Sequence, residues 1–101
     1  MTAVVEMRAL VLTLHQNRPN PFNPTTTISF VLPSRMRTSL AIFDVRGALV
    51  RRLLDEDLPA GLKEVVWDGR NQRGQPAASG LYFYELRAGK ESMTRKMLLL
   101  K

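Results

Sequence analysis

The residues that could carry out chemistry are few and scattered along this chain of 101 residues. His15 is the only histidine, and no carboxylate lies near it in the sequence. A hydrolase needs a nucleophile, a base and a group that orients the base, and this arrangement does not supply them. Paired carboxylates for glycosidic chemistry would have to come from Asp44, Asp55, Asp57, Asp68 or Glu85. Carboxylates dispersed in this way occur in any soluble domain, so we predict that the protein is not an enzyme.

A metal site is not indicated either. The chain has no cysteine, which excludes disulfides, thiol nucleophiles and thiolate metal ligands. The stretch 68–74 is similar to a calcium loop in spacing oxygen ligands along a glycine-containing turn, but it lacks the alternate acidic positions and the closing glutamate. Arg70 and Arg73 add positive charge where a cation would sit. We expect a turn whose Asp68 and Asn71 side chains accept backbone N–H groups, with no metal and no cofactor.

The charge of the chain restricts the class of partner only loosely. Fifteen Lys and Arg residues against nine Asp and Glu give a net charge of +6, but the basic residues are spread out and interleaved with acids. This favours a solvated surface, and nucleic acid is not an expected partner. No stretch of ~18 apolar residues exists, so no membrane span is predicted. Glu6 and Arg8 interrupt the start of the chain where a signal peptide is apolar, so an exported protein would carry its signal upstream.

The elements that position these residues are predicted to be strands joined by turns. The length is that of one domain, which buries roughly 65% of its unfolded surface. Apolar runs, several of them alternating with polar residues, lie at 25–32, 38–45, 48–54, 62–67, 81–88 and 93–100, and turn residues separate them. This pattern indicates an all-β antiparallel sandwich of about seven strands. We divide the chain into an extension or added edge strand at 1–15, where residues 9–15 also alternate, and a domain at 16–101.

The alternation also predicts which side chains form the core. The run 38–45 is apolar on both faces, which favours a central strand. The segment 68–80 has the composition of a long hairpin connection. We expect the Tyr82 hydroxyl to reach back to a carbonyl of the preceding turn, as in a tyrosine corner. The predicted core residues are Ile28, Phe30, Leu40, Ile42, Val65, Trp67, Tyr82, Tyr84 and Leu86.

One short motif lies near each end of the chain. The proline segment, Pro19–Pro24, has the sequence Pro-Asn-Pro-Phe-Asn-Pro and predicts a stiff, extended lead-in, because proline fixes φ and cannot donate to a strand. The closing segment, Lys96–Lys101, is apolar from residue 97 to residue 100 between two lysines. A strand that is apolar on both faces must be covered on both. The outer face of Leu98 and Leu100 therefore either meets a partner or lies under the N-terminal segment.

Taken in order, these motifs resemble the type A C-terminal sorting domain of type IX secretion cargo, and its close relative, the immunoglobulin-like domain of flagellar hook-capping proteins. The resemblance runs from about residue 14 to residue 101. Its first motif is Gln16-Asn17 leading into the proline segment and then into Thr25-Thr26-Thr27-Ile28, and its last is the closing segment. Four motifs lie between them: Phe43-Asp44-Val45-Arg46-Gly47, Leu58-Pro59-Ala60-Gly61, Val66-Trp67-Asp68-Gly69 and Ser79-Gly80-Leu81-Tyr82-Phe83-Tyr84. Arg18 departs from the family, which commonly has an aromatic residue there.

The resemblance implies an immunoglobulin-like sandwich that is recognised by outer-membrane export machinery and often removed when cargo is attached to the cell surface. It implies that Pro19, Asn20 and Pro21 belong to the opening motif of the family. It further implies that Gly80, Tyr82, Lys96 and Lys101 match its sorting motifs.

From this we expect a non-enzymatic secretion and surface-sorting module of an exported protein. Its partners would be the outer-membrane secretion or sortase machinery and a cargo domain upstream in the parent chain. An alternative is a structural assembly module, which self-associates or belongs to a hook-type filament. A carbohydrate- or polyanion-binding accessory domain is a weaker third hypothesis.

Overall fold

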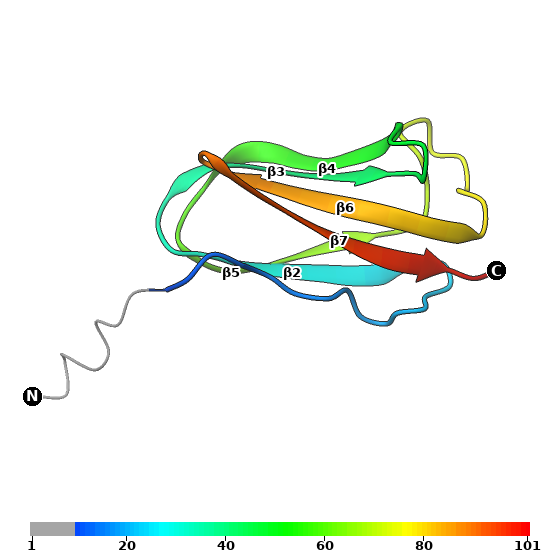
Figure 1. Ribbon diagram of the computed structural model, residues 1–101, viewed down its shortest axis with the longest axis horizontal. Helices are drawn as coiled ribbons and strands as arrows, with labels where there is room; N and C mark the ends of the chain where they lie inside the picture. The colour runs from blue at the N-terminus through cyan, green and yellow to red at the C-terminus, as the bar shows by residue number, and fades with distance from the viewer. Residues whose placement is uncertain (1–9) are drawn as a thin grey trace, which may run out of the picture.

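The computed structural model describes residues 10–101 as two antiparallel sheets packed face to face (Figure 1). One sheet has three strands in the order β1-β2-β5, and the other has four in the order β4-β3-β6-β7. The strands are β1 (Thr13–Leu14), β2 (Thr26–Leu32), β3 (Met36–Phe43), β4 (Leu49–Leu58), β5 (Gly61–Trp67), β6 (Gly80–Ala88) and β7 (Glu91–Leu99). The predicted immunoglobulin-like antiparallel sandwich of about seven strands is confirmed. Within residues 10–101 no helix is long and apolar enough to cross a membrane.

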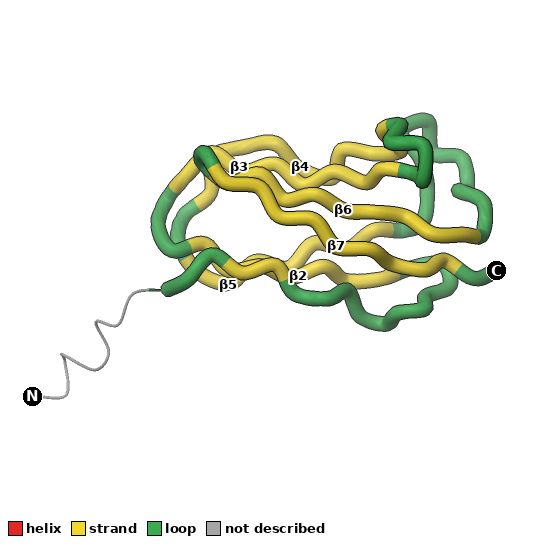
Figure 2. The backbone as a smooth tube through the Cα atoms, viewed as in Figure 1, coloured by secondary structure: helices red, strands yellow, loops and turns green. Residues whose placement is uncertain are grey.

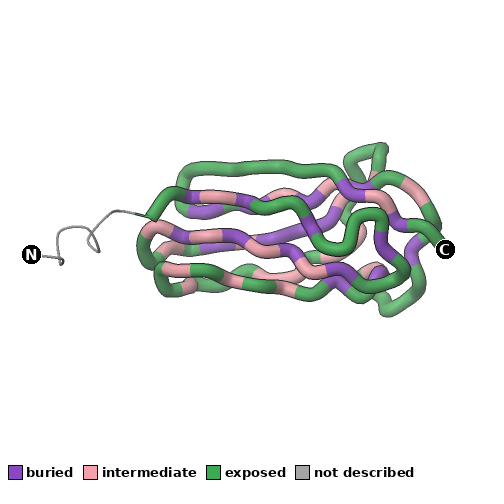
Figure 3. The backbone as a smooth tube through the Cα atoms, turned by 90° about the horizontal axis from the view of Figure 1, so that it is seen from below, coloured by how far each residue is buried: buried purple, intermediate pink, exposed green. Residues whose placement is uncertain are grey.

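Burial alternates along the strands, as the sequence pattern requires (Figure 3). In β2 every second residue from Thr26 to Leu32 is buried, and the residues between them are partly exposed. Successive side chains of a strand point to opposite faces, so one set enters the core and the other meets solvent. β3 lies between β4 and β6, which confirms the central position expected from its two apolar faces.

Most strand boundaries differ from those predicted by one or two residues, and two of the differences have a visible cause. β3 ends at Phe43, because the carboxylate of Asp44 accepts the N–H groups of Arg46 and Ala48 at 2.9 and 3.0 Å and closes a turn. β4 continues to Leu58 through an acidic run that lies beyond the predicted strand. The physical reason is cross-strand pairing with β3, because Asp55 and Asp57 lie opposite Ser39 and Arg37 in the ladder and form ion pairs diagonally with Arg37 and Arg35. Charged residues are also common on edge strands such as β4.

The segment 68–80 is not a hairpin connection, and that prediction was wrong. It leaves β5 in the three-stranded sheet and enters β6 in the four-stranded one, so it crosses between the layers at the end of the sandwich where the chain ends (Figure 2). The composition of the segment predicts turns, but it does not predict which sheet the next strand joins. Its local structure matches expectation, because Asp68 accepts the N–H of Arg70, and Asn71 accepts those of Arg73 and Gln75.

The N-terminal strand is shorter than the alternation suggested. Within residues 10–101 its ladder with β2 contains two residues, Thr13 and Leu14, opposite Val31 and Phe30. Leu12 and Leu14 are buried in the core, whereas Leu10 is exposed. The predicted strand begins at residue 9, which lies outside the described residues. Thr13 and Leu14 thus form an edge strand beside β2, and the division of the chain at residue 15 stays a prediction.

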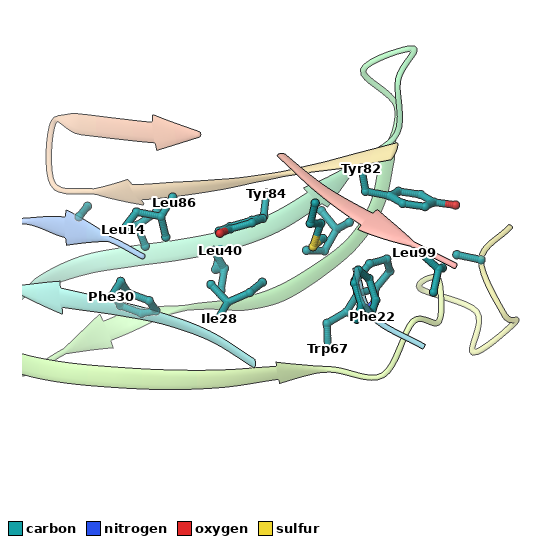
Figure 4. Close-up of a cluster of buried hydrophobic side chains, with 14 of the residues drawn as sticks. Leu14, Phe22, Ile28, Phe30, Leu40, Trp67, Tyr82, Tyr84, Leu86 and Leu99 are labelled. Atoms are coloured by element: carbon teal, nitrogen blue, oxygen red, sulfur yellow. The ribbon is translucent and has the colours of Figure 1, made fainter. Parts of the chain in front are cut away.

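The core fills the space between the two sheets (Figure 4). Eight of the nine predicted core residues are buried there, and Val65 is partly buried at the margin of the cluster. Val65 is less covered because β5 is an edge strand of its sheet. Trp67 is completely buried and large, so its truncation to alanine should lower the free energy of unfolding by about 3–5 kcal/mol.

Candidate functional site

The proline segment lies along the outer edge of β7, so the two terminal motifs of the sequence meet. The Phe22 N–H donates to the Leu98 carbonyl, and the Leu100 N–H donates to the Phe22 carbonyl, both at 3.0 Å. The Asn20 side-chain oxygen accepts the N–H of Leu98 at 2.9 Å. The amide of Gln16 reaches the carbonyl of Lys96 at 2.8 Å. These bonds give the edge strand β7 a partner over its last residues, where a bare edge would otherwise be exposed.

The chain passes from the three-stranded sheet to the four-stranded sheet between residues 15 and 22, a stretch that we call the lead-in. His15 and Arg18 hydrogen bond to β2 through their backbone, at Ser29 and Thr27, and Phe22 then pairs in parallel with β7. In Figure 1 the blue segment passes below β2 and rises toward the end of β7. The peptide bonds before Pro19, Pro21 and Pro24 are cis. Because its backbone hydrogen bonds to β2 and then to β7, this segment connects the two sheets along one side of the sandwich.

A buried polar cluster holds this crossing in place. The Tyr84 hydroxyl donates to the carbonyl of His15 at 2.7 Å and accepts the N–H of Asn17 at 2.9 Å. The side-chain amide of Asn17 donates to the Pro19 carbonyl at 3.1 Å and to the Thr26 hydroxyl at 3.0 Å. Asn17, Thr26 and Tyr84 are essentially inaccessible to solvent. Buried polar groups are tolerated when each is hydrogen bonded, as they are here, so the cluster fixes the path of the chain.

Burial raises the pKa of the Tyr84 hydroxyl above its ordinary value of 10.0. The N–H of Asn17 and the charge of Arg95 act in the opposite direction and reduce this increase in pKa. The hydroxyl is therefore protonated at neutral pH. It can serve as both donor and acceptor in the cluster.

An aromatic group lies beneath the proline segment at the end of the sandwich (Figure 4). The ring of Trp67 lies 5.6 Å from that of Phe22 and 5.5 Å from that of Tyr82, with tilted and edge-on geometries. The indole N–H donates to the Arg70 carbonyl, and the Tyr82 hydroxyl donates to the Ala78 carbonyl at 2.6 Å. The tyrosine-corner hydrogen bond expected from the sequence is thereby confirmed. Burial, and to a lesser degree the charge of Asp44, raise the pKa of Tyr82.

The structure brings most of the predicted sorting residues to one end of the molecule. Gly80 pairs with Leu99 across the β6–β7 ladder, and the N–H of Lys101 donates to the Ser79 hydroxyl at 3.0 Å. Tyr82 is buried and contributes to the core, not to the surface. Lys96 and Lys101 are exposed, and neither takes part in an ion pair among residues 10–101. Pro19, Asn20 and Pro21 are also exposed beside them.

His15 and the predicted site residues Lys96 and Lys101 all lie at exposed positions. His15 is exposed, and only its backbone is used in the contacts described above. In the part of the chain that the structure describes, no three His, Asp or Glu side chains cluster as metal ligands. This end of the molecule exposes most of the proline segment and the charged side chains of Lys96 and Lys101.

Sequence reasoning missed the residues that organise the site. In the sequence, Asn17 and Thr26 belong to the first motif of the resemblance and carry no predicted role of their own, and the Tyr84 hydroxyl has no predicted partner. One signal was available, because an asparagine before a proline-rich run and a tyrosine at a core position both require hydrogen-bond partners if buried. The identity of those partners depends on contacts between residues 67 positions apart.

Comparison with known proteins identifies the fold. A family model described as the FlgD Ig-like domain matches residues 17–92, a range that ends within β7. Dimeric latent PorU from Porphyromonas gingivalis superposes with a TM-score of 0.72 and 22% identity, over 89% of this chain and 9% of that one. PorZ, a surface component of the type IX secretion system of the same organism, has a TM-score of 0.58 and 24% identity, over 87% of this chain and 11% of PorZ.

FlgD from P. aeruginosa has the same TM-score of 0.58 and 24% identity, over 73% of this chain and 58% of that one. The chain thus corresponds to a small part of PorU and PorZ and to little more than half of the FlgD structure. A search of curated proteins finds no match. The family model covers most of the sandwich, and the chain therefore belongs to the family of FlgD Ig-like domains.

Proposed function

We propose that this domain is a non-enzymatic sorting module of an exported protein, recognised at its surface by outer-membrane secretion machinery of the type IX kind. The observation that carries the proposal is the junction of the proline segment with the closing segment. Phe22, Asn20 and Gln16 hydrogen bond to the last residues of β7, so the two motifs form a single surface. The similarity of the fold to parts of PorU and PorZ also supports a role in type IX secretion.

The junction is ordered before any partner binds, which favours recognition. A recognition element that is already ordered loses little conformational entropy when a partner binds it. The end of β7 is held on one side by β6 and on the other by the proline segment. Lys96 and Lys101 project from this rigid support without intramolecular ion pairs among residues 10–101, so their charge is available to a partner. The other residues of this chain that we propose to contact the partner lie at the same end of the domain: Pro19, Asn20, Pro21 and Gly80.

The test must separate recognition from folding. Deleting residues 96–101 would remove Met97 and Leu99, which are buried, so loss of secretion would be ambiguous. We instead suggest the double variant Lys96→Glu with Lys101→Glu, fused to a reporter that carries an export signal. The matched control is Arg73→Glu with Lys90→Glu, which changes the net charge equally at two exposed positions.

We expect the Lys96/Lys101 variant to leave the reporter in the periplasm while the control variant is secreted. Thermal unfolding of both purified domains checks that each is folded. Secretion of the Lys96/Lys101 variant at the level of the unmodified tail would refute the sorting role of these lysines.

A structural assembly module is the second candidate, and the match to the FlgD Ig-like family favours it. In this reading the same sandwich packs against copies of itself or against a hook-type scaffold. Analytical ultracentrifugation of the purified domain over a range of concentrations distinguishes self-association from the sorting role. Ordered oligomers would support the assembly module, and a monomer throughout would argue against self-association.

A further inference from the structure

The outer face of the four-stranded sheet is polar over one half and apolar over the other. Residues that pair directly across antiparallel strands share a face, so the register defines rows of side chains across the sheet. The row nearer the β6–β7 hairpin consists of Asp55, Ser39, Arg87 and Ser92. The row nearer the C-terminus consists of Leu49, Phe43, Phe83 and Lys96, and beyond it Leu81 pairs with Leu98.

We call the apolar members of this region the Phe83 patch: Phe43, Leu49, Leu81, Phe83 and Leu98. Leu49 is 47% exposed and Leu81 is 38% exposed, and the other three are partly exposed. A solvent-facing sheet surface normally alternates to polar residues, as the other half of this face does. Contiguous apolar side chains on such a surface are typical of a binding site.

Phe83 lies between two shallow hollows. One has a volume of about 390 Å³ and is lined by Phe43, Val45 and Thr94, together with the charged residues Asp44, Glu85 and Arg87. The second has a volume of about 350 Å³ and is lined by Gln16, Thr94, Arg95 and Lys96. Phe83 contributes to both. A partly exposed aromatic side chain with polar and charged groups around it has the anatomy of a protein interface.

The charge around the patch selects the partner. Arg52 and Lys96 stand on the same face and, within residues 10–101, make no ion pair, and Arg46 adjoins Val45 in the following turn. Of the two acids nearby, Glu85 is already paired with Arg87 at 3.2 Å, and Asp44 is engaged by backbone N–H groups. The chain as a whole has a net charge of +6, so two copies repel one another. The rim is therefore complementary to an acidic partner and unfavourable for a second copy.

We propose that the Phe83 patch binds an acidic protein segment that carries apolar side chains. The apolar side chains would cover Phe43, Phe83 and Leu81, and carboxylates would meet Lys96 and Arg52. This inference rests on the proposed function, which supplies the protein partner, and it adds the face of the module that the partner contacts. The face adjoins the junction at the β7 edge and shares Lys96 and Leu98 with it, but its apolar side chains belong to the outer side of the sheet.

The test uses the purified domain and a short fluorescein-labelled peptide in which Asp and Glu alternate with Leu and Phe. Two matched peptides replace the acids by Lys, or the apolar residues by Ser. Fluorescence polarisation measures affinity, and amide chemical shifts of the unmodified domain locate the bound peptide. We expect both matched peptides to bind at least about tenfold more weakly, and shifts to change at Phe43, Phe83 and Leu98.

Variants provide the second measurement. Phe83→Thr should weaken binding of the acidic apolar peptide about tenfold, and Lys96→Glu about fivefold, whereas Leu62→Thr on the outer face of the other sheet should leave it unchanged. Leu81→Thr replaces Phe83→Thr if the latter does not fold. The proposal is overturned if the Lys peptide binds as well as the acidic one, if the shifts map elsewhere, or if the domain self-associates through Phe83 instead. None of these outcomes depends on secretion, so failure here and failure of the sorting role are separately visible.

Discussion

Gly69 lies directly against Pro24. A Cβ atom at Gly69 would sit 2.6 Å from the Pro24 carbonyl oxygen, and the residue has a φ of +77°, which side chains rarely adopt. Gly69 follows β5, and Pro24 ends the proline segment, so the contact joins two of the motifs that identify the family. The close approach allows the chain to reach β2 while the segment covers Trp67.

Gly69→Ala should therefore destabilise the domain by about 2–4 kcal/mol, through backbone strain and steric overlap together. Gly74→Ala is the matched control, because Gly74 has a φ of +81° but nothing within 4 Å of its hypothetical Cβ. The control should lose only about 1–2 kcal/mol, the cost of the left-handed conformation. Urea unfolding measures both. Equal losses in the two variants would show that the contact with Pro24 carries no weight.

Tyr84→Phe should cost about 2–3 kcal/mol, because it leaves the buried Asn17 N–H and the His15 carbonyl without their partner. Tyr82→Phe removes a single hydrogen bond at the surface of the turn and should cost about 1 kcal/mol. The comparison is made by urea unfolding of both variants. If Tyr82→Phe is the more damaging change, the polar cluster is not the main anchor of the lead-in.

The tyrosines also predict a dependence of stability on alkaline pH. Burial raises the pKa of both Tyr84 and Tyr82 in the folded state above the ordinary value of 10.0. The folded state thus favours the protonated hydroxyls. Their contribution to stability is complete below pH 10.0 and is lost as the pH rises through the folded-state pKa values.

The urea midpoint should therefore be nearly constant as far as the two tyrosines are concerned until about pH 10 and then fall. The double variant Tyr82→Phe with Tyr84→Phe starts from a lower stability but should show a smaller alkaline decline. It keeps every lysine, so it controls for loss of lysine charge over the same range. A decline as steep in the double variant as in the unmodified domain would assign the effect to other groups.

The sequence was sufficient to predict the strands because local alternation decides which face of each strand is apolar. Ile28, Phe30 and Leu32 illustrate this, since period-two spacing alone places all three on the buried face of β2. The hydroxyl of Tyr82 was also predictable, because its partner lies only four residues away in a turn. Predictions of this kind depend on neighbours along the chain.

What the sequence did not reveal depends on contacts between distant residues. The extension of β4 through residues 55–57 is accompanied by ion pairs with Arg37 of β3 and with Arg35 in the turn before it. Likewise, the crossing of segment 68–80 between sheets depends on which strands pair, and turn composition does not encode that choice. The buried role of Asn17 follows from Tyr84 and Thr26, and the proline segment alone does not indicate it.

Asn20 provides the most local test of the junction between the two terminal motifs. Its side-chain oxygen accepts the N–H of Leu98, and its own position is exposed, so Asn20→Ala should remove this bond without creating a cavity. We expect a loss of about 0.5–1.5 kcal/mol in unfolding free energy and faster hydrogen exchange of the Leu98 amide. Asn23→Ala, at another exposed position of the same segment, should leave that amide unchanged. Unaltered protection of Leu98 in Asn20→Ala would mean that Phe22 and Gln16 hold the β7 edge without Asn20, and that Asn20 is free to contact a partner.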